Sequence, residues 1–307
     1  MRLTIRFIDR LHYQMKARGE GFSPMVEHSR KANLDPATVE GFGAEWAAFD
    51  QHKLVGEEYD RLFNAYFHIF PFERLPPGAE GFDLGCGSGR WAAGVAQRVG
   101  RLHCIDPSEK ALAVARKRLS GSSNIDFHQA SVDSLQLADG SQDFGYSLGV
   151  LHHVPDTRAA LIDCVQKLKS GAPFLLYLYY AFDNRPAWYR GLWAISDVGR
   201  RFVSQLPFRL RKLMTDGIAF VVYWPLARFA AVAEKLGVNV ANWPLSAYRS
   251  LSLYTMRTDA LDRFGTGLEQ RFTRAEIEAM MVAAGLGHIR FADGPPYWVA
   301  CGIRRAA

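Results

Sequence analysis

The chain has 307 residues, 49% of them hydrophobic and 22% charged, with a formal net charge of +6 at pH 7. That length and hydrophobic content are enough for one large core that carries a substantial cap. The four cysteines show no C-x-x-C pairing and no histidine at ligand spacing, which excludes a cysteine metal site and favours a reducing cytoplasm.

The charge pattern and the apolar runs narrow the range of partners. Lysine and arginine are spread through the chain rather than massed, which disfavours nucleic acid. No secretory leader is expected in residues 1–7. The best apolar run, Ile218–Ala227, is short and is interrupted by Trp224-Pro225, so no transmembrane segment is expected.

Residues 1–75 are predicted to form an N-terminal helical extension. Tyr59, Phe63 and Phe67 follow helical spacing, and Pro76-Pro77-Gly78 ends the segment. We expect this extension to pack on, or close as a lid over, the ligand mouth of the domain that follows.

The most specific pattern is Asp83-x-Gly85-x-Gly87-x-Gly89, which ends a predicted strand, makes a tight turn and opens a helix running to about Val99. Glycines in such a turn let the backbone N–H groups approach a nucleoside ligand closely. The dinucleotide fingerprint needs its third glycine one position later, where this chain has Arg90. The turn therefore disfavours NAD.

Strands and helices alternate over the next hundred residues. A second strand ends at Asp106, and Ser108 and Asp156 are predicted to cap helices. Further strands are expected at 124–129, 143–149 and 173–180. This alternation predicts an open, mostly parallel α/β sheet with its ligand at the carboxyl ends of the strands.

The alternation stops after the fifth strand. Residues 183–262 are too long for a structureless loop and predict a helical cap insertion. Thr273 and Glu276 form a capping box, and two closing strands are expected at 288–292 and 298–303. The core domain would then comprise 76–182 and 263–307.

Three segments together resemble the class I S-adenosylmethionine (SAM) methyltransferases. They are the glycine turn, His103–Ser108, and Gln142–Asp156, the last being similar to the small-molecule branch that contains the ubiquinone and menaquinone methyltransferases. The resemblance implies a Rossmann-like seven-stranded sheet ending in an antiparallel hairpin, SAM as cofactor and a methyltransferase activity.

The same resemblance indicates the cofactor-binding residues. Asp83 would take the SAM ammonium group, and Asp106 would bind the ribose diol. The adenine contact stays open between Asp133 and the pair formed by Ser131 and the Val132 N–H. The full predicted set is Asp83, Gly85, Cys86, Gly87, Gly89, Asp106, Pro107, Ser131, Val132, Asp133, Leu148 and Gly149.

His152 and His153 lie just beyond the fourth strand, where the methyl group of SAM should point. Either could remove a proton from an acceptor hydroxyl, or both could only shape the loop. The sequence favours O-methylation of a small, acidic or lipid-like molecule. The alternatives are C- or N-methylation and a SAM-binding protein without turnover.

The insertion combines aromatic residues with arginines, including Arg200-Arg201 and Arg209-Leu210-Arg211-Lys212. Its aromatic residues could form an acceptor pocket, or they could only fasten the cap to the sheet or form a dimer contact. The basic residues could form a peripheral membrane patch or the solvated back of a cap helix, and the second is favoured.

Overall fold

The computed structural model describes residues 32–306. The expectation about a leader at residues 1–7, and the first part of the predicted extension, lie outside these described residues.

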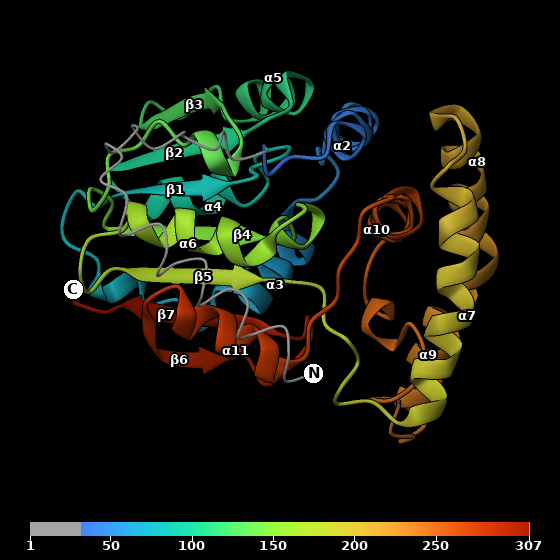
Figure 1. Ribbon diagram of the computed structural model, residues 1–307. Coiled ribbons are helices and arrows are strands. Elements are labelled where there is room, and N and C mark those ends of the chain that lie inside the picture. Colours follow the sequence, from blue (N-terminus) through green and yellow to red (C-terminus); the bar gives the residue numbers. More distant parts are fainter. Residues whose placement is uncertain (1–31, 307) are drawn as a thin grey trace, which may run out of the picture. The chain divides into compact units, whose positions relative to one another are not determined.

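A seven-stranded sheet forms the centre of the fold (Figure 1). Its strands, in the spatial order β3-β2-β1-β4-β5-β7-β6, are β1 (Glu80–Leu84), β2 (Arg101–Asp106), β3 (Ile125–Gln129), β4 (Phe144–Leu148), β5 (Pro173–Tyr177), β6 (Leu286–Phe291) and β7 (Val299–Arg304). The strands β1 to β5 pair in parallel, whereas β7 is antiparallel to both β5 and β6. The predicted open sheet with a C-terminal antiparallel hairpin is confirmed.

Helices cover both faces of the sheet, because side chains alternate along each buried strand. On one face α3 (Gly56–Phe67), α4 (Ala92–Val95) and α5 (Glu109–Arg118) bury Phe67, Trp91 and Leu112 against β2 and β4. On the other face α6 (Thr157–Lys167) and α11 (Arg274–Ala283) pack on β5. Within the predicted N-terminal extension, α3 is thus part of the core layer.

The largest differences from the expected element boundaries are at the helix after the glycine turn and at the fifth strand, while the other predicted strands shift by one or two residues at their ends. The helix after the glycine turn stops at Val95 and continues as a 3-10 turn (Ala96–Arg98), so it does not run to Val99 as a regular helix. The fifth strand ends at Tyr177 rather than Tyr180, because the chain leaves the sheet there and Tyr180 bridges to Phe272 instead.

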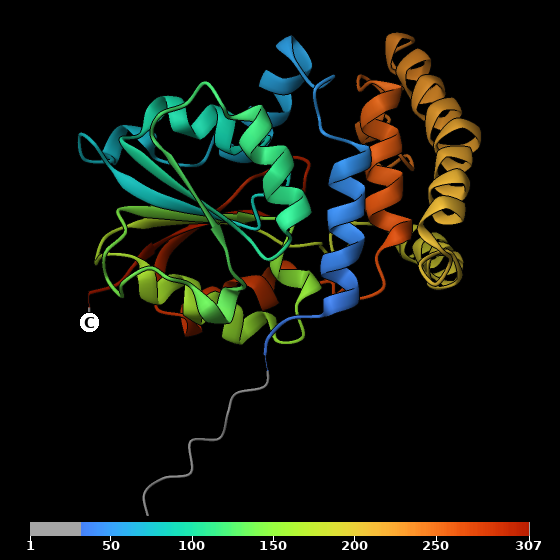
Figure 2. The ribbon, with the colours of Figure 1, turned by 90° about the horizontal axis from the view of Figure 1, so that it is seen from above.

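The insertion is helical. It contains α7 (Ala187–Val203), α8 (Phe208–Ile218), a π-helical turn (Ala219–Tyr223), α9 (Trp224–Lys235) and α10 (Leu253–Gly265). In Figure 2, α2 (Pro36–Ala48) lies between the sheet and α10, and the long helix that contains α8 lies on the far side of α10. The contacts of α10 with α2, α7 and α8 agree with that order.

The expectation that Trp224-Pro225 interrupts the apolar run is wrong. The segments α8, π turn and α9 form one helix, Phe208–Lys235, which among the described residues is the one helix long and apolar enough to cross a membrane. Pro225 falls in the first turn of α9, directly after the π turn, where a missing backbone N–H is tolerated.

Candidate active site

The glycine turn between β1 and α4 is a close-fitting cradle. Gly85, Gly87 and Gly89 all have positive φ angles of 54° to 75°. A Cβ atom on Gly87 would stand 2.8 Å from the indole Nε1 of Trp46, which belongs to α2. Glycine is therefore required by backbone conformation and by the approach of α2.

Two buried carboxylates flank this turn. Asp106, at the end of β2, accepts hydrogen bonds from the Gly87 N–H at 3.0 Å and the Ser108 N–H at 2.8 Å. Asp83 accepts one from the Tyr146 hydroxyl at 3.0 Å. Burial raises the pKa of Asp83 to about 8 and that of Asp106 to about 6. A cationic group placed beside Asp83 would stabilise its ionised form.

Most other predicted cofactor residues follow the ends of β2, β3 and β4. Ser131 caps the 3-10 turn Val132–Ser134. Asp133 accepts from the Asn33 N–H at 2.7 Å with one oxygen and from the Ser131 hydroxyl with the other. The two candidate side chains for the adenine contact, Ser131 and Asp133, are thus bound to each other.

The remaining predicted residues contribute mainly backbone. Pro107 follows β2, Leu148 ends β4, and the Gly149 N–H donates to the Tyr177 carbonyl at 3.0 Å. Cys86 places its thiol in the core, and its N–H donates to the Ile105 carbonyl at 3.1 Å. Its side chain thus lies inside the fold rather than on the ligand side.

Both histidines of the loop after β4 are buried. His153 Nδ1 lies 2.7 Å from the Leu268 carbonyl, so Nδ1–H donates and Nε2 is the unprotonated nitrogen. Nε2 has no hydrogen-bond partner among the described residues, and neither has either ring nitrogen of His152. Burial lowers the pKa of His153 to about 4 and that of His152 well below its ordinary value. Both rings are neutral at pH 7.

The cap adds acidic groups that the sequence patterns did not indicate. Tyr179, beyond β5, donates its hydroxyl to Asp262 of α10 at 2.6 Å, and its ring lies 3.9 Å from that of His152. Burial raises the pKa of Asp262 and of Asp259 to about 6. The first turn beyond β5, the loop after β4 and one face of α10 therefore share a buried polar region.

Arg90 links this region to the glycine turn. Its guanidinium lies 5.5 Å from the ring centre of Trp46 and 4.6 Å from that of Trp91. Its charge acts on Asp83, Asp259 and Asp262, lowering the pKa of each. In the sequence, Arg90 stands directly after the third glycine of the turn, at the position where the dinucleotide fingerprint has a glycine.

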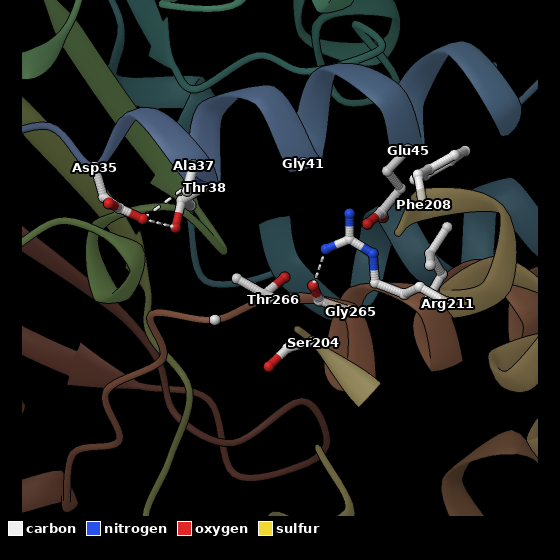
Figure 3. A pocket seen from close by; sticks show the side chains of 12 residues that line it. Asp35, Ala37, Thr38, Gly41, Glu45, Ser204, Phe208, Arg211, Gly265 and Thr266 are labelled. Atoms are coloured by element: carbon white, nitrogen blue, oxygen red, sulfur yellow. Dashed lines mark hydrogen bonds between the residues drawn. The ribbon is translucent and has the colours of Figure 1, made fainter. Parts of the chain in front are cut away.

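A cavity of about 100 Å³ lies between α2 and the cap (Figure 3). Glu45 of α2 lines it together with Arg211, whose guanidinium donates to the Gly265 carbonyl at 2.6 Å. Burial raises the pKa of Glu45 well above its ordinary value, and the nearby Asp262 raises it further. Buried polar groups thus continue from Asp262 of α10 to the contact between α2 and the cap.

Some residues of the predicted basic cluster of the insertion are buried and hold the cap in place, and others are exposed. Arg200 is buried, where it donates to Asp197 at 2.6 Å and to the Thr266 carbonyl at 2.7 Å. With Arg211 it ties the cap to residues 265–267. Arg201 and Arg209 are exposed. Among the described residues, no group of three or more His, Cys, Asp or Glu side chains could hold a metal ion.

Comparison with known proteins identifies the family. A family model described as "Methyltransferase domain" matches residues 82–176. The ubiquinone biosynthesis O-methyltransferase of Dechloromonas aromatica is 32% identical over 187 residues, which cover 57% of this chain and 76% of that protein. The enzyme of the same name from Idiomarina loihiensis is 30% identical over 240 residues, covering 69% of this chain and 93% of that one.

The chain belongs to the SAM-dependent methyltransferases. The resemblance seen in the sequence, and the enzyme class and cofactor that it implied, are thereby confirmed. The solved Haloferax volcanii complex of the Trm112 methyltransferase activator with a methyltransferase partner contains a chain of the same fold. The match has a TM-score of 0.50 at 16% identity and covers 86% of this chain and 98% of that one.

The site of this SAM-dependent methyltransferase fits its cofactor on structural grounds. Asp83 is buried and makes no ion pair among the described residues, and the Ser88 hydroxyl of the glycine turn is likewise buried there without a hydrogen-bond partner. A zwitterionic ligand with a ribose diol supplies the groups that these atoms and Asp106 lack. When bound, SAM supplies a methyl group on a sulfonium centre.

Proposed function

We propose that this methyltransferase transfers the SAM methyl group to a hydroxyl oxygen of a small molecule bound between the β4 and β5 ends and α10. The observation that carries the proposal is the state of His153. Its Nδ1–H is held by the Leu268 carbonyl, so Nε2 is left as a buried proton acceptor. The two relatives compared above, which are both named O-methyltransferases, support the same reaction.

In this proposal each site residue has a separate role in binding SAM or in removing the acceptor proton. Asp106 holds the ribose diol, Asp83 the ammonium group, and the start of the Val132–Ser134 turn faces the adenine. His153 accepts the proton of the acceptor hydroxyl at Nε2. The Leu268 carbonyl and the nearby Glu269 both raise the pKa of His153, so they stabilise the imidazolium once the proton has arrived. The ring of His152 packs at a tilt against the rings of His153 and Tyr179 and so keeps the His153 ring in place.

An amine acceptor is the second candidate. Asp259 and Asp262 are carboxylates with a pKa of about 6, and the hydroxyls of Tyr179 and Tyr248 contact them. Carboxylates beside aromatic rings suit an ammonium group. The relative from Caenorhabditis elegans named phosphoethanolamine N-methyltransferase 2, 30% identical over 145 residues and covering 46% of this chain and 31% of that protein, is consistent with this candidate.

The experiment offers SAM with a radioactive methyl group and two panels of acceptors, one of phenols and catechols and one of primary amines. We expect product from the hydroxyl panel. His153→Gln should lower kcat by about 10²- to 10⁴-fold, the usual contribution of a general base, without changing SAM affinity. His152→Gln is the matched control and should affect kcat less.

Three outcomes would overturn the proposal. Product from amines alone would establish the second candidate. SAM binding with no product from either panel or from a crude metabolite extract would favour a protein without turnover. Equal loss of kcat in both histidine variants would assign the ring pair a shaping role.

A further inference from the structure

The outer surface of the cap carries more exposed apolar side chains than a helix in contact with water usually does. In the helix Phe208–Lys235, every exposed position from 213 to 232 is occupied by a hydrophobic residue, glycine or proline. Val221 is 76% exposed and Phe229 61%. On α7, the exposed positions from 191 to 199 are likewise all apolar or glycine. Contiguous exposed apolar surface of this kind marks an interaction site.

The cap helices also carry exposed basic residues, Arg190, Arg201, Arg209 and Lys235, whereas Arg200, Arg211, Lys212 and Arg228 are hydrogen-bonded within the protein. Residues 187–236 contain eight Lys or Arg and three Asp or Glu, a net charge of +5 in a chain whose total is +6. The three acids are all held in ion pairs: Asp197 with Arg200, Asp216 with Arg257, and Glu234 with Arg249. Arg209 and Lys235 are exposed at the two ends of the long helix.

The opposite side of the long helix is fixed to the protein. Ala219, Tyr223 and Ala227 are buried against Met256 and Ala260 of α10. Towards the helix start, Asp216 joins Lys212 at 2.7 Å and Arg257 of α10 at 2.8 Å. A helix attached along its length cannot cross a bilayer without leaving α10, so its apolar side is available only to a surface that approaches the cap from outside.

We propose that this face docks the enzyme on a membrane surface containing anionic phospholipids, with the helix lying in the plane of the interface. A 28-residue helix is about 42 Å long, which gives an extended contact. Apolar side chains enter the boundary between headgroups and acyl chains, while the arginines and lysine at its edge meet the phosphates. Trp188 and Trp224, both exposed, are suited to the headgroup level. The inference does not depend on which atom is methylated.

The test is sedimentation of the full chain with vesicles of phosphatidylcholine alone and of phosphatidylcholine with phosphatidylglycerol. We expect binding to the anionic vesicles that is at least tenfold tighter than to the neutral ones and that weakens as salt is raised. The double variant Val221→Glu/Phe229→Glu should bind at least tenfold more weakly. Val55→Glu is the matched control, because Val55 is 65% exposed on the N-cap of α3, and it should bind as wild type does.

A second measurement needs no charged variant. Brominated lipids should quench the tryptophan fluorescence of the wild type, and Trp224→Phe should reduce that quenching. Light scattering in solution measures the oligomeric state, and so tests the alternative that a second copy of this chain occupies the face.

Each of four results would overturn the proposal. In the first, the wild type does not sediment with anionic vesicles. In the second, the double variant binds them as tightly as the wild type does. In the third, the wild type is a dimer that binds no vesicles, and the double variant is a monomer. The fourth is a wild-type protein that resists extraction by high salt and alkaline carbonate, which would indicate a helix that spans the bilayer.

Discussion

The glycine turn of this methyltransferase and its cap place their polar and apolar groups in opposite ways. Around the turn, backbone N–H groups and two buried carboxylates lie at the strand ends, where the Gly87 N–H donates to Asp106, and the side chains behind them are apolar core. In the cap, polar side chains such as Asp259 and Asp262 face inward, while apolar ones such as Val221 face outward. Backbone geometry suits a cofactor common to a family, whereas side chains on inserted helices suit an acceptor particular to one enzyme.

The largest expected effect concerns how the cap is held. Arg200→Ala leaves the buried Asp197 without its partner and frees the Thr266 carbonyl, so the free energy of unfolding should fall by about 3 kcal/mol or more. Arg201→Ala is the control, because Arg201 pairs with the same Asp197 at 2.9 Å but is exposed, and it should cost at most about 1 kcal/mol. Denaturant unfolding measures both. Equal losses would mean that the buried pair does not anchor the cap.

On the cofactor side, Gly87→Val should weaken SAM binding by at least about 100-fold. The residue has a φ of 54°, which β-branched residues avoid, and its new side chain would meet Trp46. Gly121→Val is the control, since a Cβ there meets nothing within 4 Å. Calorimetric titration with SAM compares the two, and tight binding by folded Gly87→Val would contradict the role of the turn.

The pH dependence of SAM affinity tests Asp83. Its pKa of about 8 in the free protein means that it is mostly protonated below that pH, while an ammonium ligand needs it ionised. Affinity should therefore rise with pH by up to about tenfold per unit between pH 5.5 and 7, where the SAM amino group stays protonated.

Asp83→Asn provides the comparison, because it removes the titrating group. Its SAM affinity should be lower than that of wild type at pH 7 and should change less with pH. A slope identical to that of wild type would remove Asp83 from the ammonium site.

The smallest expected effect tests whether α2 serves as a lid on the cofactor. A Cβ on Gly43 would come within 2.4 Å of the Ser108 Oγ, whereas one on Gly41 would meet only the end of Arg211 at 3.9 Å. Gly43→Val should push α2 away from α5 and weaken SAM binding about tenfold, and Gly41→Val should not. Equal affinities in the two variants would leave α2 without a role in holding SAM.

The sequence predicted the sheet well because its signals are local. Asp83 and the glycines mark a strand end, Ser108, Asp156 and Thr273 cap helices as expected, and apolar runs mark buried strands. The acceptor side was not predictable in the same way. Asp262 and Tyr179 are 83 positions apart and meet only through the tertiary packing of the cap. The prediction that Pro225 interrupts the helix was wrong, because Pro225 follows a π turn that no sequence pattern indicated.

The central claim is that cofactor binding belongs to the strand ends and acceptor chemistry to the cap contact. The most direct measurement is calorimetric titration of SAM into Asp106→Ala and Asp262→Asn, each checked for an intact unfolding transition. Asp106 accepts two backbone hydrogen bonds beside the glycine turn, whereas Asp262 pairs with Tyr179 on the cap side. The account predicts at least about tenfold weaker binding for Asp106→Ala and a change of at most about threefold for Asp262→Asn. Unchanged affinity in the first variant, or an equal loss in the second, would contradict it.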